Sequence, residues 1–379
     1  MTSHAASRAL GTTRVISRPG HWIEAEAIRQ LDALARLPGV RHVVGMPDLQ
    51  SGRGGPIGVA VVSDGVVYPH LTSGDIGCGI ALYETELSAE RTVVEGCARR
   101  LVGLDEPWDG DAGAWLEAHG VERATAVETQ RLGTIGGASH FAELLRVDAI
   151  FEDDVAAAHG IGTDRLLLLV HSGSRGIGDA ILRSHLEQRG LQALAIDSTL
   201  ARTYLASHAR TLRFAEANRA LIARRACDAL RSEHRPIFDV AHNTLAPADH
   251  GDGRSYVHRR GATRSSEPLL PLPGSRHSST FLIEPLRSDC DTAWSLAHGA
   301  GRRLGRADAS DSSDASAHIA SVSRAGRGGQ VICERGERLL TDSPDVYKRI
   351  DSVLACLMTH DLARPIAKLE PLLTYTSRR

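Results

Sequence analysis

Four glycine-framed turns, far apart in the chain, each carry a side chain that can bind a metal or act as a nucleophile. The turns lie at Ser73–Gly79, Gly136–Phe141, His171–Gly176 and Ala297–Arg302. A fifth candidate, His242, follows a short β-like run. Aspartate, cysteine and histidine bind divalent transition metals, and glycine-rich turns leave backbone N–H groups open to phosphate. The pattern therefore predicts a site where a metal meets a phosphate.

Composition narrows the class of protein. Of the 379 residues, 42% are apolar and 24% are charged, which suits a globular protein with a substantial core. Aromatic residues make up 4%, which argues against a nucleic-acid surface built from stacked rings. The net charge of −2 excludes a basic coat over the whole protein, although it leaves room for a local basic groove.

Cysteine usage and hydropathy indicate the compartment. The six cysteines are scattered without a C-x-x-C pair, a pattern typical of a reducing cytosol rather than of a disulfide framework. We find no apolar run of about 18 residues and no signal-peptide pattern near Met1. We therefore expect a cytoplasmic protein with no membrane partner.

Residue patterns along the chain favour one domain. Residues 1–19 are polar and expected to be loosely ordered, and residues 20–379 are expected to form a single domain, because no linker separates the candidate site residues. Leu166–Val170 is a continuous apolar run that predicts a buried strand ending at His171. We expect helices at Trp22–Leu37, over most of 87–130, at 203–233 and at Val346–Met358, strands with tight turns between Gly45 and Gly79, a hairpin or loop at Tyr256–Arg264 and a mobile segment at Ala307–Ser323.

Each candidate residue also has an ordinary structural explanation. Asp75 and Cys78 are three positions apart, so the turn can aim a carboxylate and a thiolate at one point, yet buried cysteines and turn-forming aspartates are common. His298 has an open backbone around it and Arg302 nearby, as an imidazole that attacks phosphorus requires, but the same segment is compatible with an ordinary helix start. The recurrence of such turns favours chemistry over packing.

Taken together, the motifs resemble the RtcB family of RNA ligases. The matching segments are Met46–Asp48, Pro56–Gly58, Gly74–Gly79, His140–Glu143, His171–Gly176, Ala241–Asn243, Val257–Arg264, Pro273–Ser275 and His298–Arg302. The sequence is most similar to the shorter branch of the family, whose members are associated with release factor H. The resemblance implies an α+β fold, a single large domain of mixed sheets surrounded by helices, with a metal site in a central cleft.

The resemblance also implies a reaction. The family joins an RNA 3′-phosphate or 2′,3′-cyclic phosphate to a 5′-hydroxyl end, using GTP and manganese. His298 is implied to accept GMP as a covalent phosphoramidate, and Asp48 is implied to orient its imidazole. Two Mn²⁺ ions, bridged by the thiolate of Cys78, are implied to be bound by Asp75, Cys78, His140, His171 and His242.

The resemblance assigns further residues to GTP and RNA. Glu143 is expected to read the guanine edge, and Arg175 to hold a phosphate with its planar guanidinium. The other nucleotide contacts are expected from Ser139, Ser275, Thr280, Gly299, Gly301 and Arg302. Arg260 and Arg264 belong to a basic stretch that would position RNA through its phosphates, and a solvated loop explains this stretch equally well.

Three positions depart from the family pattern. Gln50 replaces a histidine, and Ser139 replaces the asparagine that normally precedes a metal-binding histidine. Thr376 stands where the family has a lysine that contacts guanine, which argues for weaker guanylylation or an altered choice of nucleotide. Arg378 and Arg379 are the nearest cations that would replace its charge.

Three functions stay open at this point. The first is a GTP- and Mn²⁺-dependent RNA ligase acting in repair of broken structured RNA such as ribosomal RNA, with release factor H, the ribosome and an archease-type activator as candidate partners. The second is a metal-dependent RNA phosphohydrolase or cyclic phosphodiesterase that forms no GMP adduct. The third is a catalytically silent RNA- or ribosome-binding protein. The intact set of thiolate and imidazoles argues against the third and favours the ligase.

Overall fold

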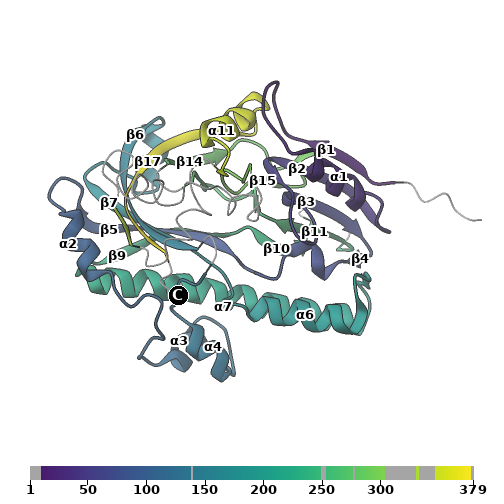
Figure 1. Cartoon of the computed structure of the whole chain (residues 1–379), viewed down its shortest axis with the longest axis horizontal. Coiled ribbons are helices and arrows are strands. Elements are labelled where there is room, and N and C mark those ends of the chain that lie inside the picture. Colours follow the sequence, from purple (N-terminus) through teal and green to yellow (C-terminus); the bar gives the residue numbers. More distant parts are fainter. Residues whose placement is uncertain are drawn as a thin grey trace, which may run out of the picture.

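An eight-stranded sheet forms one half of the molecule (Figure 1). The computed structural model describes residues 10–137, 140–248, 253–275, 278–303, 330–332 and 346–376. Seven strands follow the order β13-β14-β17-β6-β7-β5-β9, each antiparallel to its neighbours, and β16 pairs in parallel with β17. Their bounds are β5 Gly79–Ser88, β6 Phe141–Ile150, β7 Arg165–Ser172, β9 His234–Ala241, β13 Leu270–Pro273, β14 Thr280–Pro285, β16 Gln330–Ile332 and β17 Ala363–Thr376.

A five-stranded sheet in the order β1-β2-β3-β11-β10 forms the other half. Its strands are β1 Thr12–Val15, β2 Val40–Gln50, β3 Ile57–Asp64, β10 Asn243–Pro247 and β11 Ser255–Arg260. Two small ribbons pair β12 (Ala262–Arg264) with β15 (Ser295–Ala297) and β4 (Val66–Val67) with β8 (Leu194–Ala195). Because β1 pairs in parallel with β2, the expectation of a loosely ordered segment over residues 1–19 is wrong for Thr12–Val15.

Helices cover the outer faces of the sheets. They are α1 Ala25–Leu34, α2 Val94–Arg100, α3 Ala112–Ala118, α4 Ala126–Arg131, α5 Asp153–Ala158, α6 Ile177–Arg189, α7 Thr199–Leu230 and α11 Ile350–Thr359, with 3₁₀ turns η1 Pro69–Thr72 and η2 Cys290–Thr292. Figure 1 shows α7 running along the larger sheet, with α3 and α4 as a small helical lobe beyond it. The α+β fold of mixed sheets surrounded by helices is confirmed.

The structure confirms two predicted elements, the strand β7 and the long helix α7. In β7, Leu168 and Val170 pack into the core beneath α7, while Leu167 and Leu169 pack into the core on the opposite face of the sheet. A strand covered on both faces is apolar at every position, which confirms the buried strand predicted there. The long helix predicted at 203–233 is also confirmed, since α7 begins after Ser198, whose Oγ accepts a hydrogen bond from the third residue of the helix.

Other expectations need correction. The helix expected at Val346–Met358 begins only at Ile350, because the backbone of residues 346–348 pairs with that of residues 301–303 instead. The region 87–130 is not mostly helical; it holds three short helices joined by turns. The basic stretch at Tyr256–Arg264 consists of two strands separated by Gly261 (φ +63°). The first, β11, pairs with β3 and β10, and the second, β12, pairs with β15. The segment Ala307–Ser323 lies outside the described residues.

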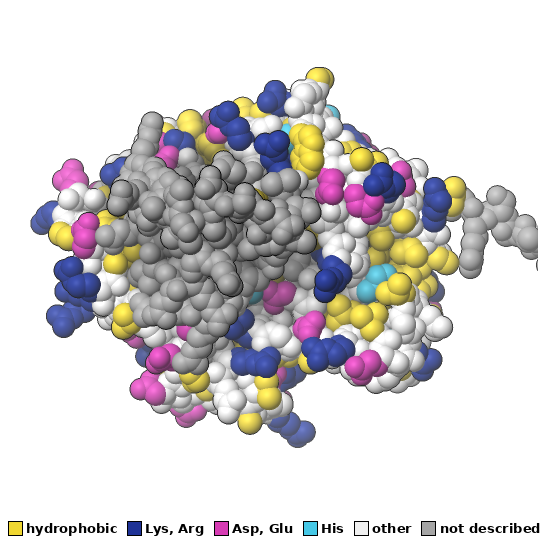
Figure 2. Space-filling view, viewed as in Figure 1, with side chains coloured by type: hydrophobic (Ala, Val, Ile, Leu, Met, Phe, Trp, Pro, Cys, Tyr) yellow, Lys and Arg dark blue, Asp and Glu magenta, His cyan; other side chains and the backbone are white. Residues whose placement is uncertain are grey.

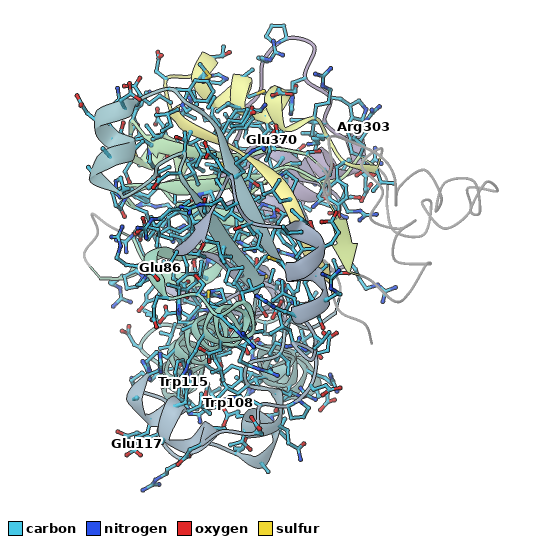
Figure 3. The ribbon with its side chains drawn as sticks, turned by 90° about the vertical axis from the view of Figure 1, so that its left-hand side faces the viewer. Glu86, Trp108, Trp115, Glu117, Arg303 and Glu370 are labelled. Carbon is cyan, nitrogen blue, oxygen red and sulfur yellow. The ribbon has the colours of Figure 1, made fainter. Side chains whose placement is uncertain are left out.

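The surface carries mixed charge. On the face seen in Figure 2, basic and acidic side chains are interspersed over the described surface, as the small net charge leads one to expect. Trp108 and Trp115 lie in the helical lobe, at the opposite end of the molecule from Arg303 (Figure 3). Among the described residues, no helix is both long and apolar enough to cross a membrane.

Candidate active site

Four neighbouring strands bring the predicted metal ligands to one edge of the larger sheet. Cys78 directly precedes β5 and His140 directly precedes β6. His171 is the penultimate residue of β7, and His242 directly follows β9. Adjacent strands are antiparallel, so the start of one meets the end of the next. The first residue of β5 pairs with the last residues of both β7 and β9, and the first residue of β6 pairs with His171. Sheet register therefore makes these side chains converge.

The side chains are close enough to share a cation. The Sγ of Cys78 lies 3.3 Å from the Nε2 of His140 and 3.3 Å from the Nε2 of His171. These three donor atoms all lie within 4.8 Å of one another. The Nε2 of His140 also lies 2.9 Å from Oδ2 of Asp75, and the ring of His242 is centred 5.2 Å from that of His171.

Burial sets the protonation of this cluster. It lowers the pKa of His171 and of His242 well below the usual value, so both rings are neutral and offer a lone pair. Burial and the neighbouring Asp75 raise the pKa of Cys78, so the thiolate needs a cation beside it. Burial would raise the pKa of Asp75, but His140 and hydrogen bonds from Ser174 outweigh it and keep the carboxylate ionised. Soft sulfur, neutral imidazole and carboxylate fit a divalent transition metal.

A buried arginine holds the ligand-bearing strands together from below. Arg219 of α7 is fully buried, and its Nη1 donates to the carbonyl oxygens of Gly77 (2.6 Å) and Ser172 (2.9 Å). Its Nε donates to both carboxylate oxygens of Asp239 on β9. One guanidinium thus links the turn before β5 to β7 and β9, directly beside Cys78 and His171. Its position inside a long helix gave no sign of this role in the sequence.

The opposite wall of the site comes from different sheets. Asp48 lies on β2, is fully buried and accepts a hydrogen bond from the backbone N–H of His298 (3.2 Å). The Nδ1 of His298 lies 2.6 Å from Oδ2 of Asp48, although the ring is turned away from a linear hydrogen bond. The His298 ring is centred 4.8 Å from that of His242. The predicted nucleophile therefore stands between its predicted orienting carboxylate and the metal-ligand cluster, with Nε2 available for bonding.

Two glycines lie against Asp48 and His298 where no side chain would fit. A Cβ on Gly261 would lie 2.9 Å from Cε1 of His298, and a Cβ on Gly301 would lie 2.2 Å from the carbonyl oxygen of Asp48. Both glycines also adopt positive φ, which other residues reach only with strain. The open backbone approach expected around His298 is thus present.

Both walls face one cavity of about 870 Å³. Most of the residues predicted to act are on its lining: Asp75, Cys78, His140, Glu143, His171, His242, Arg260, Ser275, Thr280, His298, Gly299, Gly301 and Arg302. Asp48 lies directly behind His298. A pocket of this size suits a nucleotide together with part of a second ligand.

Two further predicted residues that the structure describes, Arg175 and Arg264, are not on this lining. Arg175 packs against Gly136 and donates from Nε to Oγ1 of Thr134 (3.1 Å). Arg264 is exposed at the end of β12. Ser139 lies outside the described residues. The structure thus brings Arg260 to the cavity and leaves Arg175 and Arg264 off its wall.

Comparison with known proteins settles the family. The family model described as tRNA-splicing ligase RtcB matches residues 30–104 and 109–377. The chain belongs to the RtcB family. It is 40% identical over 355 residues to the RNA-splicing ligase RtcB2 of Escherichia coli, covering 93% of this chain and 92% of that protein. It is 28% identical to the RNA-splicing ligase RtcB of Mycobacterium bovis (90% and 99% covered) and 27% identical to the tRNA-splicing ligase RtcB of Archaeoglobus fulgidus (92% and 91%).

In this RtcB-family chain, Thr374 lines the cavity although it was not predicted from the sequence. Glu143 is buried and accepts a hydrogen bond from Oγ1 of Thr374 on β17. Thr376 is two positions further along the same strand and lines the cavity too, at the point where a lysine was expected. Alternation along β17 would have indicated that both share a face, but the partner strand was not predictable. Gln50, noted as a departure, accepts a hydrogen bond from the backbone of Arg302 (2.6 Å).

Proposed function

We propose that this protein is a GTP- and manganese-dependent RNA ligase that joins 3′-phosphate or 2′,3′-cyclic phosphate ends to 5′-hydroxyl ends through a histidine–GMP intermediate. The observation that carries the proposal is the contact of His298 with the buried Asp48, opposite the cluster around Cys78. Manganese ions bound to that cluster would neutralise charge on the transferring phosphoryl group. Membership of a family whose described relatives are RNA ligases supports the same reaction.

In the first step of the proposed reaction, transfer of GMP to His298, each residue has a separate role. Asp48 contacts the Nδ1 side of His298, which leaves the Nε2 lone pair for the α-phosphorus of GTP. An N–P bond forms, the bond from phosphorus to the bridging oxygen breaks, and pyrophosphate leaves. Arg302 lines the cavity beside the nucleophile and would hold phosphate oxygens with its planar guanidinium. The carboxylate of Glu143 would accept from the N1–H and the exocyclic amine of guanine.

RNA joining follows by two further displacements. Water first opens a cyclic end to the 3′-phosphate. A 3′-phosphate oxygen then attacks the phosphorus of the adduct and releases His298, and the RNA 5′-hydroxyl displaces GMP to form the phosphodiester. Arg260 lines the cavity, and hydrogen bonds from its Nη atoms to the carbonyl oxygens of Arg53 and Gly54 hold its positive charge there. It would therefore suit a phosphate of the RNA backbone, a contact that positions the strand without reading sequence.

The cellular role is part of the proposal. The resemblance to the branch associated with release factor H favours repair of broken structured RNA, including ribosomal RNA, in the cytoplasm, with an archease-type activator as a further partner.

Labelled GTP tests the mechanism. The purified protein is incubated with Mn²⁺ and GTP labelled at the α-phosphate, beside His298→Ala and a control, His119→Ala, in the helical lobe. Acid-labile, alkali-stable label on the wild type and the control, absent from His298→Ala, is the expected result. Cyclic-phosphate opening should persist in His298→Ala, since no N–P bond is needed for it.

A second function is favoured by one observation. Thr376 lines the cavity without a positive charge, where the family resemblance leads one to expect a lysine on guanine. A metal-dependent phosphohydrolase or cyclic phosphodiesterase needs no guanine contact. If the protein binds metal and opens cyclic ends but takes up no label with or without an activator, the result would favour the hydrolase over the ligase.

A further inference from the structure

Lysine is rare in this protein, and one lysine is buried. Of the 44 lysine and arginine residues only two, Lys348 and Lys368, are lysines. Lys368 on β17 is partly exposed and pairs with Asp148 (2.8 Å) and Glu370 (2.9 Å). Lys348 is 5% exposed and does not line the cavity. Burying an ammonium is costly unless its protons are hydrogen-bonded, so its contacts call for an explanation.

The ammonium of Lys348 is hydrogen-bonded to the backbone on both sides of Asp48. Its Nζ donates to the carbonyl oxygens of Pro47 (2.9 Å) and Leu49 (2.7 Å). The Pro47 oxygen also lies 2.6 Å from Nε2 of His21. A compact ammonium with three donors can span two carbonyls from one atom, whereas the planar guanidinium of arginine is wider.

The backbone of Lys348 also contacts the turn that carries His298. The N–H of Lys348 donates to the carbonyl oxygen of Gly301 (3.0 Å), three residues after His298 in the glycine-rich turn. Lys348 therefore joins the strand that carries Asp48 to the turn that carries His298. These two segments come from different sheets, and a single residue fixes their separation.

We propose that Lys348 is a positioning residue for catalysis, which fixes the carboxylate of Asp48 against the imidazole of His298. The inference rests on the proposed role of His298 as nucleophile. We call the contacts of the Lys348 ammonium with Pro47 and Leu49 the clamp. Without the clamp, the backbone of β2 between these two residues can shift, and the carboxylate of Asp48 moves out of place relative to the imidazole of His298. Since a misplacement of about 1 Å can cost roughly 10²-fold in rate, adduct formation should suffer while metal binding does not.

Electrostatics around the clamp add a pH signature. Burial lowers the pKa of Lys348 to about 8, against the opposing effects of Asp48, Cys356 and Glu24. His21 also faces the ammonium. Above that pH the ammonium loses its charge, so the clamp weakens and adduct formation should fall. The free energy of unfolding changes in the opposite direction. It rises between about pH 8 and the ordinary lysine pKa, because in this range the folded state binds fewer protons than the unfolded state. A decline of activity without unfolding thus marks this residue.

Three variants test the proposal. We expect Lys348→Met to form the GMP adduct at least tenfold more slowly at saturating GTP and Mn²⁺, with metal affinity within threefold of wild type. Lys348→Arg should restore part of the rate and remove the decline above pH 8. Lys368→Met serves as the matched control and should keep the wild-type rate. The proposal is overturned if Lys348→Met matches wild type, or if it loses metal binding in parallel with the adduct.

Lysine-selective labelling covers the case in which Lys348→Met fails to fold. With [¹³C]lysine the wild type gives two side-chain Cε signals, one of which should titrate near pH 8 and move to lower pH in Asp48→Asn. Two signals that both titrate at the ordinary lysine value would overturn the clamp. Failure of the proposed function is separate from this result: it appears as wild type without any adduct, while the Cε titration still reports whether Lys348 senses Asp48.

Discussion

The Nδ1 atom of His298 lies 2.6 Å from Oδ2 of Asp48, although 250 positions separate the two residues in the chain. The carboxylate is fully buried, and the same oxygen accepts the backbone N–H of His298. A buried anion beside one ring nitrogen fixes the orientation of the ring and favours the tautomer protonated on that side. The other nitrogen is then the one that would act as nucleophile in the proposed reaction.

Asp48→Asn should slow formation of the GMP adduct by about 10²-fold, because a neutral amide stabilises the developing imidazolium poorly. Single-turnover labelling with GTP measures the rate. Metal affinity serves as the internal control, since Asp48 lies behind His298 and outside the cluster around Cys78. An unchanged labelling rate would show that the carboxylate has no orienting role.

Cys78→Ser should abolish tight metal binding, because a serine hydroxyl is a far weaker ligand than a thiolate for a borderline-soft cation. Calorimetric titration with Mn²⁺ measures the affinity directly, because its signal does not depend on the thiolate that the substitution removes. Cys290→Ser changes an exposed cysteine and should behave as wild type. A Cys78→Ser protein with full affinity would remove the thiolate from the predicted ligand set.

Asp239→Asn should lower the free energy of unfolding by about 3 kcal/mol, because the buried Arg219 loses the carboxylate to which it is hydrogen-bonded. Chemical denaturation gives the difference from wild type. Asp228→Asn breaks the exposed pair with Arg224 (3.7 Å) on the same helix and should cost about 0.5 kcal/mol or less. Equal costs for the two variants would mean that burial of the first pair does not matter.

Gly261→Ala should block adduct formation while metal still binds. The new methyl carbon would lie 2.6 Å from Cγ2 of Ile57 and 2.9 Å from Cε1 of His298, so the imidazole must move. Gly253→Ala introduces a Cβ at a similar positive φ (+77°) with no atom within 4 Å among the described residues, and it therefore reports backbone strain alone. If both variants label equally well, the close approach at Gly261 is unimportant.

Acid should destabilise the protein partly through His208. Burial lowers the pKa of this 1% exposed side chain to about 4, and its Nε2 accepts a hydrogen bond from the backbone of Leu245 (3.2 Å). The unfolded state binds the extra proton first, so this contribution is present above pH 6.5 and is lost as pH falls towards 4. His208→Gln should reduce the slope of unfolding free energy against pH by up to about 1.4 kcal/mol per unit in that window. Denaturation at several pH values measures the slope, and an unaltered slope would contradict the assignment.

Local patterns accounted for the elements whose signal is contained in their own residues. The apolar run in β7 and the long apolar stripe of α7 are visible without knowledge of their neighbours, because burial on both faces or on one stripe dictates composition. The region 87–130 and the start of α11 were placed less well. Their short helices and turns depend on packing against α7 and on bonds to the 301–303 backbone, which no local pattern encodes.

The sequence by itself determined the chemical inventory: one thiolate, one carboxylate and a set of histidines in glycine turns, in the order that places the chain in the RtcB family. Tertiary structure decided which of them meet. Antiparallel register brings Cys78, His140, His171 and His242 to one sheet edge, and contact between two sheets sets Asp48 against His298. Thr374 and Lys348 join the site only through such long-range contacts. Neither residue belongs to a motif in the sequence, and their roles arise from neighbours hundreds of residues away.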